Sequence, residues 1–274
     1  MTLDAAAGAA AGLGPLSLGR ARARARGFHG SHARRVAGAG SEFWQYRELQ
    51  PGEAIDRVDW RRSGRSDHLY VREREREDPV RLWLWVDASP SMDFASAPAA
   101  PTKLARARQI AGALALAAVA GGERIADLMR PGERSAAQEL LATIGAVDGA
   151  LPAEALHSGD AVLLVGDFLD GAPAAWVDAA AAAGAVGALI AVADPAEADF
   201  PFAGRTRFEA IEASDEPREF ARAEAIRDDY LAAWAAHRAR LDAIGTIAGW
   251  TSLAHRTDAD PAATLAAAAA WLRG

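Results

Sequence analysis

The sequence predicts an α/β fold in which a mostly parallel sheet is covered by helices on both faces. Short apolar segments typical of strands alternate along the chain with longer segments of helical spacing. The segments 161–165 (AVLLV) and 188–192 (ALIAV) are continuously hydrophobic, as expected of parallel strands that are buried on both faces. With 274 residues, 51% of them hydrophobic, the chain can form a substantial core.

Three regions follow one another along the chain. Residues 1–37 are expected to form a flexible basic segment, residues 38–79 a β-rich block, and residues 80–274 the α/β domain. The segment Arg20–Arg35 contains six arginines and no acidic residue, which is typical of a solvated, flexible segment. The alternative is that it docks on an acidic protein, an anionic lipid surface or nucleic acid. Because only Phe28 could stack on a base, we expect no nucleic-acid partner, and contact with a membrane surface stays open.

The block 38–79 is expected to be largely extended. The segments 57–63 (RVDWRRS) and 68–79 (HLYVREREREDP) are interpreted as strands. In the second segment arginines and glutamates alternate, so that both faces of the strand are charged. Such a strand belongs at the edge of a sheet or in a projecting hairpin, where charge prevents unwanted pairing. A helix stabilised by Arg72–Glu75 pairs is the weaker alternative.

The elements of the α/β domain follow from hydrophobic periodicity. Strands are expected at 80–87, 123–129, 161–167, 186–194 and 250–258, with a loop and a short strand at 200–213. Helices are expected at 103–122, 135–147, 173–183, 217–244 and 261–273, the last of which begins at Pro261. In the first strand, two tryptophans alternate with three aliphatic residues, so that Trp83 and Trp85 face one side of the sheet and Leu82, Leu84 and Val86 the other.

Two of the most hydrophobic strands end in an acidic residue. Asp87 follows the first strand, and Asp167 follows the segment 161–166. In open parallel sheets, ligands bind at the carboxyl ends of the strands. If these two strands are neighbours, both carboxylates share that edge. Ser89 and Ser91 follow Asp87 at every second position, so both hydroxyls can point the same way. Carboxylate and hydroxyl oxygens, without sulfur or imidazole, suit a hard cation such as Mg²⁺.

The stretch Asp87-Ala88-Ser89-Pro90-Ser91 resembles the Asp-x-Ser-x-Ser motif of von Willebrand factor A-type domains. In that family the motif opens a metal-ion-dependent adhesion site, in which both serines and two aspartates hold Mg²⁺. The resemblance therefore implies a von Willebrand A-like fold and a metal site formed by Asp87, Ser89, Ser91 and Asp167. The family also uses a threonine from an intervening loop, for which Ser135 is the nearest candidate. The alternative without a metal is that Asp87 and the serines only cap the turn that follows.

A group of residues that precedes this motif resembles a more specific family. It consists of residues 40–43 (GSEF), Arg47, 51–53 (PGE), 57–60 (RVDW) and 63–65 (SGR). These residues resemble the signature of a bacterial group, domain of unknown function family 58 (DUF family 58), with mild departures at Leu49, Glu53, Val58 and Gly64. The resemblance implies von Willebrand A-like proteins that are often associated with MoxR-type AAA+ ATPases. The block also contains charged residues of both signs and a tryptophan, which we expect to form a structural ion-pair network: Arg47, Asp56, Arg57, Asp59, Trp60 and Arg65.

Several classes of protein are excluded or disfavoured by the residues that the chain lacks. It contains no cysteine, which excludes disulfides, thiolate catalysis and cysteine-ligated zinc. A P-loop needs glycines before its lysine, but the only lysine, Lys103, follows Thr102 without them. Dehalogenase-type phosphatases need Asp-x-Asp at a strand end, where this chain has Ser89. The apolar stretch 171–193 contains Asp178 and is interpreted as a helix, a turn and a strand, so no transmembrane segment is expected.

The function expected from these residues is that of a cytoplasmic, non-enzymatic interaction module, an adaptor or assembly factor. Its site would hold Mg²⁺ through Asp87, Ser89, Ser91 and Asp167 and would bind a carboxylate of a protein partner. The resemblance implies a MoxR-type AAA+ ATPase as that partner. A magnesium-dependent hydrolase of phosphate esters and a scaffold that binds no metal are the two alternatives.

Overall fold

A computed structural model of the chain describes residues 3–28, 37–50, 53–55, 58–65, 68–75, 81–130, 137–146, 149–152, 156–169, 171, 173–209 and 217–274. The chain divides into two compact units. The larger unit comprises Met1–Phe28 and Val80–Gly274, and the smaller unit comprises His29–Pro79.

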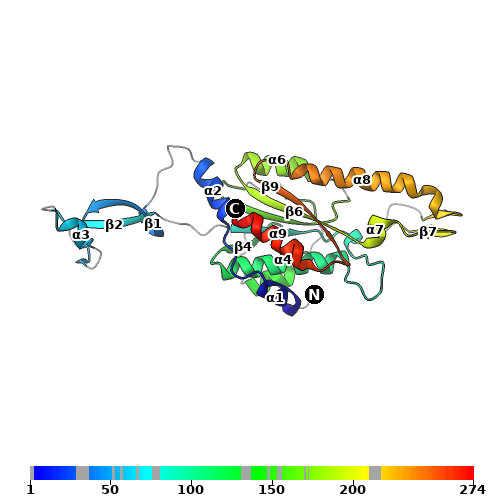
Figure 1. Ribbon diagram of the computed structural model, residues 1–274, viewed down its shortest axis with the longest axis horizontal. Coiled ribbons are helices and arrows are strands. Elements are labelled where there is room, and N and C mark those ends of the chain that lie inside the picture. Colours follow the sequence, from blue (N-terminus) through cyan, green and yellow to red (C-terminus); the bar gives the residue numbers. More distant parts are fainter. Residues whose placement is uncertain are drawn as a thin grey trace. The chain divides into compact units, whose positions relative to one another are not determined.

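A parallel sheet forms the centre of the larger unit (Figure 1). Its strands are β3 (Arg81–Val86), β4 (Arg124–Asp127), β5 (Ala161–Gly166), β6 (Val186–Ala193) and β9 (Trp250–Arg256). They lie in the order β4-β3-β5-β6-β9, and each neighbouring pair is parallel. The mixed α/β fold with a mostly parallel sheet is therefore confirmed.

The strand order creates a switch point between β3 and β5. From β3 the chain crosses to β4 on one side of it, and it then returns to β5 on the other side. In open parallel sheets, ligands bind outside the carboxyl ends of the strands at such a point. Val86 pairs with Val165 at the end of both strands, and Asp87 N donates to Val165 O at 2.9 Å. The residues that follow β3 and β5 therefore leave the sheet side by side.

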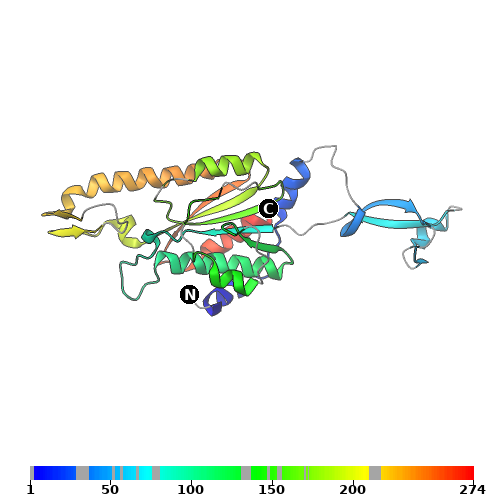
Figure 2. The same ribbon diagram turned by 180° about the vertical axis from the view of Figure 1, so that it is seen from behind.

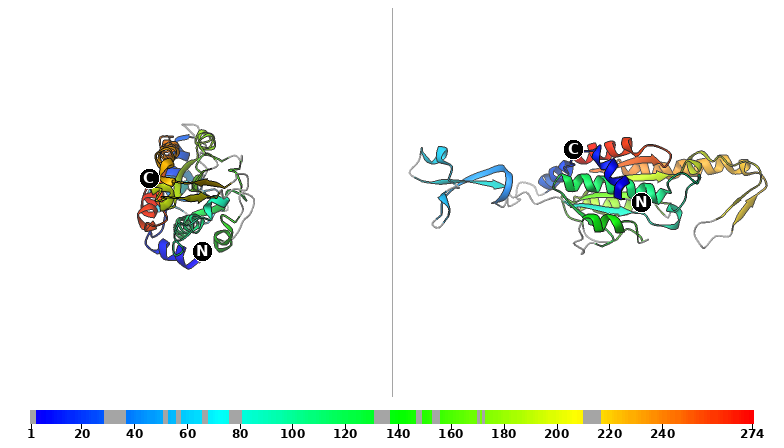
Figure 3. Two further views of the ribbon diagram at one scale, coloured as in Figure 1. Left: turned by 90° about the vertical axis from the view of Figure 1, so that its right-hand side faces the viewer. Right: turned by 90° about the horizontal axis from the view of Figure 1, so that it is seen from below.

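Helices cover both faces of the sheet (Figures 2 and 3). One face carries α4 (Lys103–Ala120), α5 (Ala137–Thr143) and α9 (Pro261–Arg273), and the opposite face carries α6 (Ala174–Ala182) and α8 (Arg227–Ile244). The alternation expected in β3 is confirmed, because its aliphatic residues pack on the α4 side and Trp83 and Trp85 on the α8 side. Each helical layer thus buries one face of strands that are hydrophobic on both sides.

The N-terminal residues form helices where a flexible segment was expected. The helices are α1 (Leu3–Ala11) and α2 (Gly19–Phe28), and the connecting residues Leu16 and Leu18 are fully buried in the core beneath α4. Arg22 pairs with the buried Glu123 at 2.7 Å, and the Arg20 guanidinium lies 4.5 Å from the ring centre of Trp271. These partners are remote in sequence, which is why the arginine-rich composition suggested a solvated segment. The rest of the basic run, residues 29–35, lies outside the described residues.

The smaller unit contains a two-stranded antiparallel sheet of β1 (Ala37–Glu48) and β2 (Tyr70–Glu75). The extended conformation expected for 68–79 is confirmed over β2. The strand expected at 57–63 is wrong, because α3 (Trp60–Ser63) forms there and the Asp59 side chain caps it by accepting from Arg62 N at 3.0 Å. Of the expected ion-pair network, the structure shows Arg47 paired with Glu53 at 2.5 Å, whereas Trp60 is 60% exposed. Asp56 and Arg57 lie outside the described residues.

The long helix expected at 217–244 begins later, at Arg227. The preceding residues form β8 (Arg218–Phe220) and the 3₁₀ turn η4 (Ala223–Ile226), and β8 pairs with β7 (Thr206–Phe208) in a short antiparallel sheet. An edge-to-face contact between Phe208 and Phe220, with ring centres 5.8 Å apart, favours this sheet over continuation of the helix. In Figure 1, β7 and the short helix α7 (Pro195–Asp199) lie together at one end of the large sheet.

No helix in the described part of the chain combines the length and the apolar character needed to cross a membrane.

A buried histidine at the end of β9 makes folding stability depend on pH. His255 is 3% exposed, and its Nδ1 lies 2.9 Å from Thr264 Oγ1. Burial, followed by the nearby charge of Arg106, lowers the pKa of His255 from 6.5 to about 4. Between these two values the unfolded chain binds a proton that the folded protein does not, so folding stability is lost as the pH falls.

We expect the free energy of unfolding to decrease by about 2 kcal/mol between about pH 7 and pH 5 because of His255 alone. Urea denaturation of the wild type and of His255→Gln at both pH values measures this contribution. The variant should lose that part of the pH dependence and keep the part that comes from other groups. An identical pH dependence in the two proteins would contradict the assignment.

Candidate functional site

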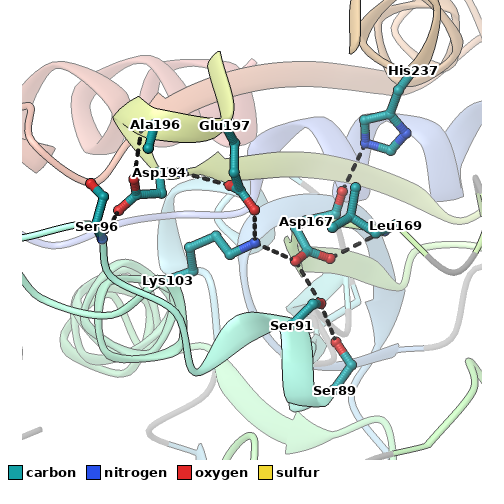
Figure 4. Close-up of polar contacts among 10 residues, drawn as sticks. All are labelled: Ser89, Ser91, Ser96, Lys103, Asp167, Leu169, Asp194, Ala196, Glu197 and His237. Atoms are coloured by element: carbon teal, nitrogen blue, oxygen red, sulfur yellow. Dashed lines mark hydrogen bonds and ion pairs between the residues drawn. The ribbon is translucent and has the colours of Figure 1, made fainter. Parts of the chain in front are cut away.

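Four side chains that the sequence singled out meet at the switch point of the sheet. Figure 4 shows three of them, Ser89, Ser91 and Asp167. The fourth, Asp87, contacts Ser89 through its carboxylate. Asp87 follows β3 and Asp167 follows β5, while Ser89 directly precedes the turn η3 (Pro90–Met92) and Ser91 lies within it. All four are almost completely buried, with exposed fractions between 3% and 7%. The expectation that two distant strand ends bring these residues together at one edge is confirmed.

The loop after β3 is folded by its own side chains. Asp87 Oδ1 accepts a hydrogen bond from Ser89 N at 2.9 Å, which closes a tight turn of the kind that aspartate favours. Pro90 then begins η3, and Met92, which is fully buried, anchors this turn in the core. As a result the two hydroxyls face each other, with Ser89 Oγ 3.1 Å from Ser91 Oγ.

Asp167 closes the site from the neighbouring strand. Its Oδ2 accepts a hydrogen bond from Ser91 Oγ at 2.7 Å, and its Oδ1 accepts one from Leu169 N at 3.1 Å. Phe168 between them has a left-handed backbone with φ of 56°, and its ring stacks on Trp85 at 5.7 Å. His237 from α8 holds the backbone of the same turn, because its Nε2 lies 3.0 Å from Asp167 O. The carboxylate is therefore fixed from several directions.

Gly166 is required for this close approach, and the sequence analysis did not identify it. A Cβ atom at position 166 would lie 2.5 Å from the Cβ of Asp87 and 2.9 Å from its Oδ2. Real Cβ atoms do not come this close, so any larger residue would displace the Asp87 carboxylate. A glycine directly before a strand-end aspartate was the available signal.

Lys103 is the second residue that the sequence analysis missed. It is the first residue of α4 and is fully buried, and its Nζ donates to Asp167 Oδ2 at 2.7 Å and to Glu197 Oε1 at 2.5 Å. The sequence analysis considered this residue only as a P-loop lysine. Its position as the single lysine of the chain, shortly after the Asp87 loop, was the signal that could have identified it.

Glu197 belongs to α7, which follows the strand-end acid of β6. Asp194 and Glu197 form a capping box: Asp194 Oδ1 accepts from Ala196 N, and Asp194 N donates to Glu197 Oε2, both at 2.8 Å. Asp194 Oδ2 also accepts from Ser96 N at 3.0 Å. This aspartate, to which the sequence assigned no role, thus fixes the carboxylate that holds Lys103.

Comparison with known proteins identifies the family of the chain. The family described as "Protein of unknown function DUF58" matches residues 45–138 and 134–240. The chain belongs to this family. "Uncharacterized protein Mb1516" from Mycobacterium bovis and "Uncharacterized protein Rv1480" from Mycobacterium tuberculosis are each 32% identical to it over 259 residues, which cover 85% of this chain and 80% of each relative. No solved structure matches the chain. The DUF58 match includes both strand-end aspartates, both serines, Lys103 and Glu197.

The DUF58 site contains more negative than positive charge. Burial raises the pKa of Asp87, and the neighbouring Asp167 adds to this effect, while hydrogen bonds from Ser89 oppose it. Burial also raises the pKa of Glu197, and the charge of Lys103 opposes that shift. Asp167 and Glu197 contact the one ammonium group, while Asp87 has none beside it among the described residues, and an additional cation would relieve this excess of carboxylates.

The oxygen atoms of the site suit Mg²⁺. Two carboxylates and two hydroxyls, from Asp87, Ser89, Ser91 and Asp167, are hard ligands of the kind this ion prefers. Within the described ranges, no group of three or more His, Cys, Asp or Glu side chains could hold a metal ion. A cation here would therefore depend on the serine hydroxyls. Ser135, the candidate for the family's threonine, lies outside the described residues.

Asp87→Asn tests the electrostatic cost of the site. Since burial raises the pKa of Asp87, ionisation of this carboxylate lowers folding stability as the pH rises through the folded pKa. Asparagine keeps an oxygen that can accept from Ser89 N and removes the charge. We expect the free energy of unfolding at neutral pH, in the presence of EDTA, to increase by more than the roughly 0.5 kcal/mol typical of surface substitutions.

Urea denaturation measures this change, with Asp93→Asn as the control. Asp93 lies in the same loop but is exposed, so its substitution should alter stability by less than about 0.5 kcal/mol. A loss of stability in Asp87→Asn that exceeds the change in Asp93→Asn would show that the ionised carboxylate stabilises the fold without a metal.

Proposed function

We propose that this protein is a non-enzymatic interaction module that uses a divalent cation, with Mg²⁺ as the natural choice, to bind a protein partner. One observation carries the proposal: the hydrogen bond of 2.7 Å from Ser91 Oγ to Asp167 Oδ2, which joins two strand ends 76 residues apart in the sequence. It brings hard oxygen ligands together at the point of the sheet where ligands bind. A von Willebrand A-like fold, with its metal-ion-dependent adhesion site, accounts for this arrangement.

In this proposal, Asp87, Ser89, Ser91 and Asp167 hold the cation. When bound, the cation supplies positive charge that a Glu or Asp side chain of the partner can approach. Hydrogen bonds within this chain hold the four ligand side chains in place, and burial keeps water away from them. The negative charge of the carboxylates then favours binding of one further cation. A MoxR-type AAA+ ATPase is the partner that the family resemblance favours, with this chain as its adaptor or assembly factor.

The surface beside the site has the features of a contact region. Leu169 lies two residues after Asp167 and is 46% exposed, although it is a large apolar side chain. Pro90 and Asp93, on the other side of the site, are also exposed. A partner that reaches the buried oxygens would cover Leu169, and burial of this side chain would add to the binding energy.

A scaffold that binds no metal is the second candidate, and Lys103 favours it. The ammonium group of this residue already supplies one positive charge to Asp167. If that charge is sufficient, the site is a structural joint between β3, β5 and α7 and needs no further cation. Turnover of a phosphate ester that Asp87→Ala abolishes would instead support a magnesium-dependent hydrolase.

Isothermal titration calorimetry with Mg²⁺ and Mn²⁺ separates the first two candidates. We expect binding in the wild type and a loss of affinity of about tenfold or more in Asp87→Ala, because one charged ligand is removed. Asp93→Ala, which removes an exposed carboxylate from the same loop, should bind as the wild type does. Equal heats of binding in the wild type and in Asp87→Ala would contradict a metal site at Asp87 and would support the scaffold that binds no metal.

Leu169→Ser tests the interaction claim separately from the metal claim. The exposed side chain makes no contribution to the oxygen ligands, so the affinity for Mg²⁺ should stay the same. Binding to a purified MoxR-type ATPase from the same organism, measured by biolayer interferometry with Mg²⁺, should weaken about tenfold. EDTA should abolish binding of the wild type.

Val119→Ser is the matched control, because Val119 is 39% exposed and lies at the other end of α4 from Lys103. It should leave binding of the ATPase unchanged. Binding that is insensitive both to EDTA and to Leu169→Ser would contradict the proposed interaction surface.

A further inference from the structure

Lys103 is an unusual residue in this chain. It is the only lysine among 30 basic residues of the Lys and Arg types, and its side chain is completely buried. Lysine is almost never fully buried unless its charge is paired. The pairing here is double, because Nζ contacts both Asp167 and Glu197. The compact ammonium group has three donors, two of which are directed at these carboxylates.

The position of Lys103 in α4 is electrostatically unfavourable for the helix. It is the first residue of an 18-residue helix, where the aligned peptide dipoles leave partial positive charge. A cation at this end destabilises a helix unless carboxylates offset it. The stability of α4 therefore gives no reason for a lysine at this position, whereas the charge balance of the site does.

The contacts of Asp167 place Lys103 in direct competition with a metal ion. Asp167 Oδ2 accepts from both Ser91 Oγ and Lys103 Nζ, each at 2.7 Å. The other oxygen of this carboxylate, Oδ1, already accepts from Leu169 N. The Ser91 hydroxyl lies against Oδ2, so a cation that binds this hydroxyl and Oδ2 together would share that oxygen with the ammonium group or replace the ammonium group there.

Glu197 provides the lysine with a second partner. Lys103 Nζ lies 2.5 Å from Glu197 Oε1, and the capping box with Asp194 holds this glutamate in place from the opposite side. If the ammonium group loses its contact with Asp167, it keeps a charged hydrogen bond to Glu197. The glutamate thereby lowers the cost of releasing Asp167 to a metal ion.

We propose that Lys103 is an internal cation that competes with the divalent metal for Asp167, and that Glu197 sets the strength of this competition. The inference rests on the proposed metal site and assigns two residues outside its four ligands. Lys103 makes the affinity for metal lower than the four oxygens alone would give. It also keeps Asp167 paired whenever no metal is bound.

The double variant Lys103→Met/Glu197→Gln tests the proposal by calorimetry with Mg²⁺. It removes one positive and one negative charge from neighbouring positions, so the net charge of the site is unchanged. Both replacements are close in volume to the original side chains, and circular dichroism and thermal unfolding verify the fold. We expect Mg²⁺ to bind about tenfold more tightly than in the wild type, because Asp167 no longer has an internal cation. Affinity equal to or lower than that of the wild type would overturn the proposal.

The single variant Glu197→Gln should change the affinity in the opposite direction. Among the described residues, Asp167 is then the one charged partner left to the lysine, so Mg²⁺ should bind at least about threefold more weakly. Asp199→Asn removes the same charge from the same helix at a side chain that pairs with Arg256, and it should bind as the wild type does. If Lys103 and Glu197 only stabilised the fold, the double variant would also bind Mg²⁺ more weakly than the wild type.

The outcomes separate this inference from the proposed function. If the wild type binds Mg²⁺, Asp87→Ala does not, and Glu197→Gln and the double variant match the wild type, the competition is wrong and the metal site stands. If the double variant binds Mg²⁺ and the wild type does not, the competition is supported in its strongest form. If no protein in the series binds Mg²⁺, the metal site and the competition both fall.

Discussion

The architecture of the site depends on the hydrogen bond between the Ser91 hydroxyl and Asp167. This contact joins the ends of β3 and β5, the two strands between which the sheet changes its direction of winding. It places the motif of one loop against the carboxylate of another in a region that is almost closed to water. The resulting group of oxygens is costly, because burial disfavours its negative charge. Lys103 relieves part of that cost from the first turn of α4.

Much of the larger unit could be predicted from the sequence. The strands β5 and β6 are hydrophobic at every position that packs between two helical layers, so their length and parallel pairing follow from composition. Asp87 and Asp167 could be placed at one edge because both directly follow such strands. The tryptophans of β3 alternate with aliphatic residues, so the face that they occupy also follows from the pattern. In each case the contacts that determine the structure are local in the sequence or repeat at every second residue of a strand.

The parts that the sequence did not predict depend on partners far away in the chain. Lys103 contacts Asp167 and Glu197 at separations of 64 and 94 residues, and its being the single lysine of the chain did not reveal these partners. The arginines of α2 suggested a solvated segment because composition alone does not show that Arg22 contacts Glu123 and Arg20 contacts Trp271. The start of α8 was misplaced because β8 pairs with β7, which outweighs helix propensity in residues 218–220. These errors share one cause: tertiary contacts overrode a local preference.

Crystals grown with Mn²⁺ provide the most direct measurement, because anomalous scattering locates this ion without assumptions about its ligands. The account predicts an anomalous peak about 2 Å from oxygens of Asp87, Ser89, Ser91 and Asp167, with the ammonium group of Lys103 moved away from Asp167 and still paired with Glu197. The contradicting result is a map with no anomalous peak at the site, in which Lys103 still bridges the two carboxylates at saturating Mn²⁺. In that case the lysine would be the only cation of the site, and the protein would bind its partners without a metal.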